Sequence, residues 1–271
     1  MDPYFIPVML TALVGGAGTG LLGVQIVGMR IPLLGVVVSH AAMVGAVGAH
    51  VLGLSSEWLL PCAAGAAMLG AIPLGALRSQ DTRIDTNVLM GVLFSLTMGL
   101  AFLGIGLSQR EQSTLLGILW GSLNFVTVRD LPVITATVLA LAAFIAAFHK
   151  ELRTILFSRE LARAGGVHEA AVWTGYLVLT GLTLAVNLNA VGGLMIFSLL
   201  SNPAVAAAQL ARSYLGMLIW SASLGAASAL LGFLAAYALG LPTGASIVLT
   251  SSTLLAAAFT WRSFDTATSN G

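Results

Sequence analysis

His40 and His50 lie in an apolar stretch of the chain that contains no Asp, Glu, Lys or Arg. A neutral imidazole costs less to bury in a membrane than a charged side chain does. It is also a good ligand for zinc, iron or manganese. The residue type and its setting therefore make both histidines candidates for contacting a metal ion that crosses a membrane.

His40 has neighbours that could take part in such a contact. Ser39 precedes it in the chain, and Met43 follows three residues later on a similar face of a helix, where its thioether could act as a soft ligand. Simple packing is the alternative interpretation of Met43, and a hydrogen bond to a neighbouring helix is the alternative for His40. His50 is rotated from His40 by about 80° around a helix, so the two need not share a site. We expect His50 near the outer end of its helix, either as an entrance residue for cargo or as a partly solvated interfacial residue.

Asn202 and Pro203 interrupt a second apolar stretch. Proline removes a backbone donor and can break a helix, which would expose carbonyl groups to a transport pathway. A kink that serves only packing is the alternative. Asn202 is therefore a further candidate for the pathway.

Membrane helices must position these side chains. The chain has 271 residues, of which 58% are hydrophobic and only 8% charged, whereas soluble domains carry about 25% charged residues. Apolar runs recur along its whole length, and runs of about 20 residues are long enough to cross a hydrocarbon core. They are continuous rather than alternating, which excludes a β-barrel. We predict an all-α, polytopic helical bundle with about eight or nine transmembrane helices, forming one domain over residues 1–271.

The predicted spans have approximate bounds. The apolar block 171–211 is interrupted from Asn187 to Gly193, and we interpret that interruption as a turn. The nine spans are Phe5–Gly28, Leu34–Leu54, Trp58–Leu77, Asn87–Leu107, Leu131–Phe148, Ala171–Val186, Ala190–Ala211, Tyr214–Leu239 and Thr243–Trp261.

Lys and Arg predict the orientation of the chain, because cytosolic loops of membrane proteins are enriched in them. Nine of these residues follow odd-numbered spans and two follow even-numbered spans. This distribution predicts an N-terminus outside the cell and a cytosolic C-terminus. The polar tail at residues 263–271 is expected to be disordered.

A charged segment at residues 150–169 holds seven of the 21 charged residues of the chain and falls on the predicted cytosolic side. Phe157 or Ser158 is expected to precede a helix over residues 159–164, and Gly165 and Gly166 would end it. Phe157 and Leu161 would lie on one side of this helix and could press into a hydrophobic groove of a partner. An ordinary solvated loop is the alternative interpretation.

Some chemistry is excluded by what the sequence lacks. It contains no G-x-x-x-x-G-K-[ST] nucleotide-binding loop, and its only lysine is Lys150. If this protein uses ATP, we therefore expect a separate subunit to hydrolyse it. The single cysteine, Cys62, excludes disulfides within the chain and cysteine-based metal cages. There is no basic tract to support nucleic-acid binding.

Four patches of sequence follow one another along the chain. One is G-V-V-V-S-H-A-A-M-V-G at 35–45, and another is N-V-L-M-G-V-L-F-S at 87–95. The third is F-S-R-E-L-A-R-A-G-G-V at 157–167. The fourth begins N-A-V-G-G-L-M-I-F-S at 189 and is followed by L-P-T-G-A-S-I-V-L at 241–249. In this order, the patches resemble the permease subunits of metal-uptake ABC transporters, the ZnuB-like proteins that import zinc, manganese or iron.

The resemblance implies an ABC importer permease in the cell membrane that carries a divalent metal ion as cargo and holds no permanent cofactor. It also implies three kinds of partner: a second copy of the permease, cytosolic ABC ATPase subunits, and an extracytoplasmic metal-binding protein. A coupling helix that contacts the ATPase would be formed by Phe157, Ser158, Arg159, Glu160, Leu161, Ala162, Arg163 and Gly166.

One departure from the family pattern concerns the cargo. The family commonly has an acidic residue four positions before the histidine, where this chain has Val36. A carboxylate and an imidazole at that spacing share a helix face and could meet a cation together. Without the carboxylate, a permease for a metal chelate or another small solute is an alternative. A secondary transporter driven by protons or sodium and a structural membrane protein are further alternatives.

Overall fold

The computed structural model describes residues 5–76, 85–108, 130–192 and 195–269, and this part of the chain contains helices and no strand. The helices are α1 (Phe5–Gly28), α2 (Leu33–Val51), the short 3-10 helix η1 (Ser56–Trp58), α3 (Leu59–Ala76), α4 (Thr86–Leu107), α6 (Asp130–Ala147), α7 (His149–Phe157), α8 (Arg159–Ala164), α9 (Glu169–Val191), α10 (Ile196–Leu210), α11 (Tyr214–Leu239) and α12 (Thr243–Ser269).

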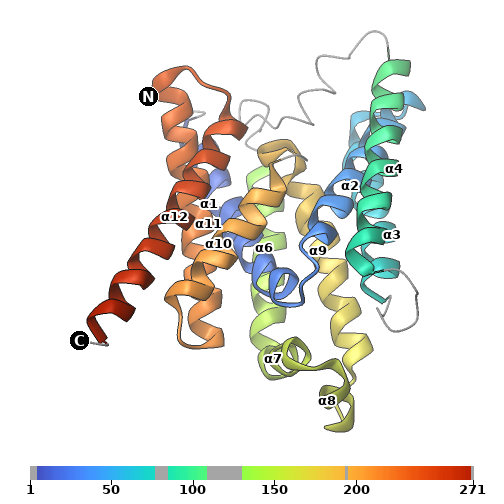
Figure 1. Ribbon diagram of the computed structural model, residues 1–271. Helices are drawn as coiled ribbons and strands as arrows, with labels where there is room; N and C mark the ends of the chain where they lie inside the picture. The colour runs from blue at the N-terminus through green and yellow to red at the C-terminus, as the bar shows by residue number, and fades with distance from the viewer. Residues whose placement is uncertain (1–4, 77–84, 109–129, 193–194, 270–271) are drawn as a thin grey trace.

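Seven of these helices are long and apolar enough to cross a membrane, namely α1, α2, α4, α6, α9, α11 and α12. Two more, α3 and α10, contain shorter apolar stretches. Each of the nine predicted spans thus corresponds to one helix, which confirms the all-α membrane bundle. Figure 1 shows α1 beginning at one end of the bundle and α12 ending at the other, where α7 and α8 lie.

Close packing of α1 against α11 forms part of the centre of the bundle. A Cβ atom at Gly16 would collide with the carbonyl oxygen of Gly225, and one at Gly20 would collide with that of Ser221. The Ser221 hydroxyl donates a hydrogen bond of 2.6 Å to the carbonyl oxygen of Gly20. Small residues that let two backbones approach, with a hydroxyl bonding across the contact, are typical of helix pairs in lipid.

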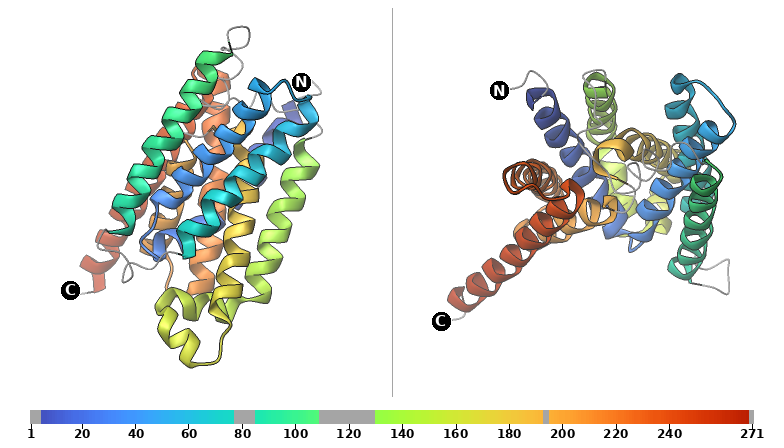
Figure 2. Two further views of the ribbon diagram at one scale, coloured as in Figure 1. Left: turned by 90° about the vertical axis from the view of Figure 1, so that its right-hand side faces the viewer. Right: turned by 90° about the horizontal axis from the view of Figure 1, so that it is seen from above.

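Helix α2 is enclosed by protein, since it packs against α3, α4, α9 and α10. In the most apolar 18-residue stretch of α2, 72% of the stretch is buried inside the protein, compared with 17% in the corresponding stretch of α4. In the view from above in Figure 2, α4 and the far end of α12 stand away from the centre of the bundle. Side chains on α2 therefore face neighbouring helices more than lipid.

Three predictions about local structure were wrong. The break between α9 and α10 lies at Gly192, which has φ 84°, and the expected turn residue Asn187 is helical. Asn187 keeps the helix because its Nδ2 donates to the Thr183 carbonyl oxygen at 2.9 Å. Pro203 lies inside α10 without breaking it. The tail that we expected to be disordered from Ser263 continues α12 as far as Ser269.

Candidate functional site

The predicted metal-contacting residues are centred on His40, in the first half of α2. Ser39, His40 and Met43 are fully buried, and Val36 is 8% exposed. The imidazole ring of His40 meets the ring of Phe94 from α4 edge-on, with centroids 5.0 Å apart. The site is therefore a protein-lined position inside the bundle, and we call Val36, Ser39, His40 and Phe94 the α2 site.

The carbonyl oxygen of Val36 orients both polar side chains of the α2 site. It accepts a hydrogen bond from the Ser39 hydroxyl at 2.9 Å, and it lies 2.9 Å from His40 Nδ1. Because a carbonyl oxygen can only accept, this contact places the imidazole proton on Nδ1. Nε2 then carries a lone pair. His40 therefore donates its hydrogen bond to a carbonyl oxygen of α2 itself. The alternative interpretation, a hydrogen bond to a neighbouring helix, was wrong.

His40 Nε2 is buried and has no hydrogen-bond partner within the described part of the protein. Buried polar atoms are nearly always paired, so an unpaired one calls for an explanation. A neutral imidazole whose Nδ1 is held by a carbonyl presents Nε2 in the form that ligates metals. The α2 site thus offers one oriented nitrogen donor.

The other candidate residues do not join His40 in a ligand cluster. Met43 belongs to the hydrophobic core of the bundle, and His50 lies in the last turn of α2. Asn202 ties α10 to α12, because its Nδ2 donates to the hydroxyls of Ser251 at 3.0 Å and Ser252 at 3.2 Å. Among the described residues, no group of three or more His, Cys, Asp or Glu side chains could hold a metal ion.

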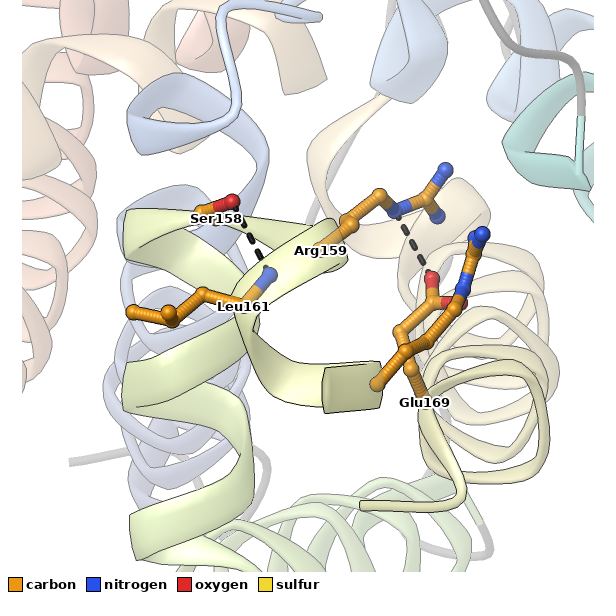
Figure 3. Close-up of polar contacts among 5 residues, drawn as sticks. Ser158, Arg159, Leu161 and Glu169 are labelled. Carbon is orange, nitrogen blue, oxygen red and sulfur yellow. Dashed lines mark hydrogen bonds and ion pairs between the residues drawn. The ribbon is translucent and has the colours of Figure 1, made fainter. Parts of the chain in front are cut away.

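The predicted coupling segment forms the helix that its sequence indicated. Ser158 is the N-cap of α8, and its hydroxyl accepts from the backbone N–H of Leu161 at 3.2 Å. The helix ends at Ala164, and Gly166 follows with φ 81°, a conformation that favours glycine. Figure 3 shows the cap and the Leu161 side chain. The local prediction for residues 158–166 is thereby confirmed.

Two apolar side chains of this segment lack cover from the rest of the chain. Phe157 is 84% exposed and Leu161 is 55% exposed, whereas Ala162 on the inner side of α8 is fully buried. The charged Glu160 is also exposed. Apolar groups displayed outside a membrane bundle are typical of a surface that a partner covers.

A buried carboxylate, Glu169 at the start of α9, fixes α8 to the bundle. Its side chain is only 3% exposed, and Arg159 Nε lies 2.9 Å from its Oε1. Arg163 donates to Oε2 from Nε at 3.0 Å and from Nη2 at 2.9 Å. The Arg159 guanidinium also lies 5.0 Å from the centre of the Trp173 ring. We call these four residues the Glu169 clamp; Figure 3 shows the Arg159 contact.

Aromatic residues of α9 connect the Glu169 clamp to the core of the bundle. Trp173 stacks on Tyr176 at 5.5 Å between ring centroids, and the Tyr176 hydroxyl donates to the carbonyl oxygen of Leu22 in α1 at 2.9 Å. Further along, α9 packs against α2, α3 and α6. The sequence analysis did not predict the Glu169 clamp or its aromatic contacts. The only feature of the sequence that pointed to this region was the run of charged residues at 150–169.

The bundle, with a short capped helix fixed at one end of it by ion pairs, defines a multi-pass membrane protein. The chain belongs to the ABC 3 transport family, whose sequence model matches residues 1–262. Membership confirms the resemblance to metal-uptake ABC permeases that the four sequence patches indicated.

Relatives of this chain align over nearly their full length. The high-affinity zinc uptake system membrane protein ZnuB of Haemophilus influenzae is 27% identical over 254 residues, which cover 94% of this chain and 96% of the relative. The manganese import system permease protein ScaB of Streptococcus gordonii is 27% identical over 258 residues, covering 93% and 88%. The structure of PsaBC from Streptococcus pneumoniae in complex with Fab is similar, with a TM-score of 0.84 and 26% identity, covering 96% of this chain and 92% of that one.

Proposed function

We propose that this chain is the permease subunit of an ATP-driven importer that carries divalent transition metal ions, zinc, manganese or iron, into the cell. A second copy of the chain would complete the pathway, and a separate cytosolic subunit would hydrolyse ATP. An extracytoplasmic metal-binding protein would deliver the ion. The N-terminus would lie outside and the C-terminus in the cytosol. The zinc and manganese permeases among its relatives support this cargo class.

The observation that carries the proposal is the exposed apolar pair at the α7–α8 junction, Phe157 at the end of α7 and Leu161 in α8, while the Glu169 clamp holds α8 from behind. An ATPase that grips the exposed side of α8 could move it only together with the start of α9. Because α9 packs on α2 as well as α1, that movement reaches the helix that carries His40. In this account the chain performs no chemistry, and ATP hydrolysis drives alternating access through α8 and α9.

His40 would act as a transient contact for the ion rather than as a storage site. Its free Nε2 offers a single nitrogen ligand, and the bond from Nδ1 to the Val36 carbonyl oxygen fixes the direction of that ligand. A transport pathway needs binding that is strong enough for entry and weak enough for exit. One oriented donor, with water completing the coordination of the ion, satisfies both conditions.

Val36 favours a second candidate cargo, a metal chelate or another small solute. The position one turn before His40 is aliphatic and nearly buried, so the α2 site carries no negative charge to attract a bare cation. A chelate with low net charge would not need that attraction. Secondary transport driven by protons or sodium has no such support, because α2 holds no acidic residue.

Uptake by proteoliposomes would test the function. The permease is reconstituted with its ATPase and its binding protein, and uptake of free zinc, manganese and iron is compared with uptake of the same metals in chelated form. We expect ATP-dependent accumulation of at least one free ion. Accumulation of chelated metal alone would replace the main proposal with the second candidate, and ATP-independent uptake would contradict both.

A further inference from the structure

A hollow of about 710 Å³ lies at the base of the bundle, where α7 and α8 approach the start of α11. Figure 1 shows α7 at this end of the molecule, following the membrane-crossing helix α6. The polar residues that line the hollow are His149, Lys150, Arg153, Thr154 and Tyr214. This hollow is distinct from the α2 site. Phe157 and Leu161 of the coupling segment also line it, so it adjoins the surface expected to bind the ATPase, but the coupling mechanism does not use its polar groups.

The charge of the hollow favours an anion. Lys150 and Arg153 line it, and its lining includes no Asp or Glu side chain; Glu151 of α7 is not part of the wall. Tyr214 is the first residue of the long helix α11, so the positive end of the α11 dipole also faces this region. Basic pockets between membrane helices at the cytosolic boundary are typical binding places for anionic lipid headgroups.

Two atoms in the wall are left without partners. His149 Nε2 and the Tyr214 hydroxyl are buried, and neither has a hydrogen-bond partner among the described residues. Their rings pack together with centroids 5.0 Å apart, so the two polar atoms belong to one place in the structure. Buried polar atoms are normally paired, so two unpaired ones beside a basic hollow call for an explanation.

An apolar groove adjoins the hollow. It has a volume of about 360 Å³, runs between α6 and α11 beside α1, and is lined mostly by small and aliphatic residues such as Ala142, Ala146, Leu218 and Ala222. His149 lines both the hollow and the groove. Because α6 and α11 are long and apolar enough to cross a membrane, an apolar groove between them suits a lipid chain better than a soluble protein.

We propose that the hollow and the groove form one site for an anionic phospholipid. The phosphate group lies in the hollow with Lys150, Arg153, His149 and Tyr214, and an acyl chain lies in the groove beside Ala146. A bound lipid ties α7 to the start of α11, next to the joint at Phe148 where α6 ends. The inference is independent of the cargo, because the experiment measures lipid binding and not transport.

The test measures lipid retained by the full-length chain. Protein in detergent is incubated with equal amounts of phosphatidylglycerol and phosphatidylcholine, and the bound lipid is counted by native mass spectrometry. We expect phosphatidylglycerol to be retained preferentially. Arg153→Ala should weaken that retention about fivefold, as expected for one basic residue at an anionic headgroup. The exposed Arg262, which contacts Gln209 in α10, is the matched control, and Arg262→Ala should leave retention unchanged.

Two further variants test the groove and the unpaired hydroxyl separately. Ala146→Trp fills the groove and should abolish retention, whereas Ala147→Trp, at the next residue along α6 and outside the groove, should not. Tyr214→Phe keeps the ring but removes the hydroxyl, and it should weaken retention without unfolding the chain. All of these variants change exposed or half-buried side chains, so folding is expected to survive.

Three results would overturn the proposal. Equal retention of the two lipids would remove the need for an anionic headgroup. Equal losses in Arg153→Ala and Arg262→Ala would point to unspecific charge. Displacement of the lipid by millimolar inorganic phosphate would show an anion site in which the acyl chain has no part.

Discussion

The Glu169 clamp and the α2 site treat buried polar groups in opposite ways. At the clamp, where α9 begins, a buried carboxylate meets two guanidinium groups, one at each of its oxygens. In the α2 site every polar group is neutral, Ser39 and His40 both bond to one backbone carbonyl oxygen, and His40 Nε2 is left unpaired. The two ion pairs make the clamp suitable for transmitting force, and the unpaired nitrogen makes the α2 site suitable for a passing ligand.

The reason for the difference is the cost of burying charge. A charge at the centre of a bilayer costs about 2.5–3.5 kcal/mol on insertion scales, so α2 carries none. The charges of the Glu169 clamp cost less to bury, because the side chains of Arg159 and Arg163 remain 20% and 37% exposed, respectively, and are still partly solvated.

Leu161→Asp should abolish ATP-dependent metal uptake. The substitution places a charge on the exposed apolar side of α8, where the ATPase is expected to bind, and desolvating an unpaired carboxylate there would be strongly unfavourable. Because Leu161 is 55% exposed, the fold should survive. Uptake by proteoliposomes and co-purification of the ATPase are measured. Leu161→Met, which keeps an apolar side chain, is the control. Undiminished uptake by Leu161→Asp would show that α8 does not couple the permease to the ATPase.

His40→Ala should lower metal uptake about tenfold, which corresponds to the loss of one contact of roughly 1.4 kcal/mol. The variant removes the nitrogen donor while the α8 region stays intact, so binding of the ATPase should not change. The control is Met43→Leu, a change in a fully buried side chain that we regard as packing. If His40→Ala transported free metal ions normally, the α2 site would not be part of the pathway.

Glu169→Gln should lower the amount of metal moved per ATP several-fold while ATP hydrolysis continues. Loss of the carboxylate leaves two arginines without their charged partner, and such a loss costs about 1–3 kcal/mol. The junction of α8 and α9 should loosen, and the melting temperature should fall. Glu151→Gln, which removes one carboxylate from the neighbouring helix α7, is the comparison. Unchanged coupling in Glu169→Gln would mean that the clamp serves stability alone.

Asn202→Ala should have the smallest effect. Its hydrogen bonds to Ser251 and Ser252 join α10 to α12, and bonds between membrane helices are worth about 0.6 kcal/mol on average. We expect a slightly lower melting temperature with uptake preserved. Ser198→Ala, whose hydroxyl bonds within α10, should change stability less. A large loss of uptake without loss of stability would indicate that Asn202 is part of the transport pathway, as the sequence suggested.

Local signals in the sequence were sufficient for much of the fold. Long apolar runs located the nine helices, and a serine before and two glycines after residues 159–164 delimited α8. These features succeed because caps and membrane spans are determined within a few residues of the chain. The same local reasoning identified His40 as a candidate, because a titratable group in an apolar run is visible without the fold.

Features that depend on packing were not predictable. Pro203 is tolerated inside α10, and Asn187 is helical, with its side chain against Gly15 of α1. A glycine turn separates Arg159 from Glu169 in the sequence. The two side chains pair only because this turn brings the start of α9 back beside α8, which the sequence does not reveal. The direction of His40 Nδ1 and the resulting free Nε2 likewise required coordinates.

The most direct test of the account measures ATP hydrolysis and metal uptake in the same proteoliposomes for the wild type and Glu169→Gln. The account predicts that the wild type couples the two and that the variant hydrolyses ATP while accumulating several-fold less metal per ATP. Identical ratios of metal to ATP in both proteins would contradict transmission from α8 through the Glu169 clamp to α9.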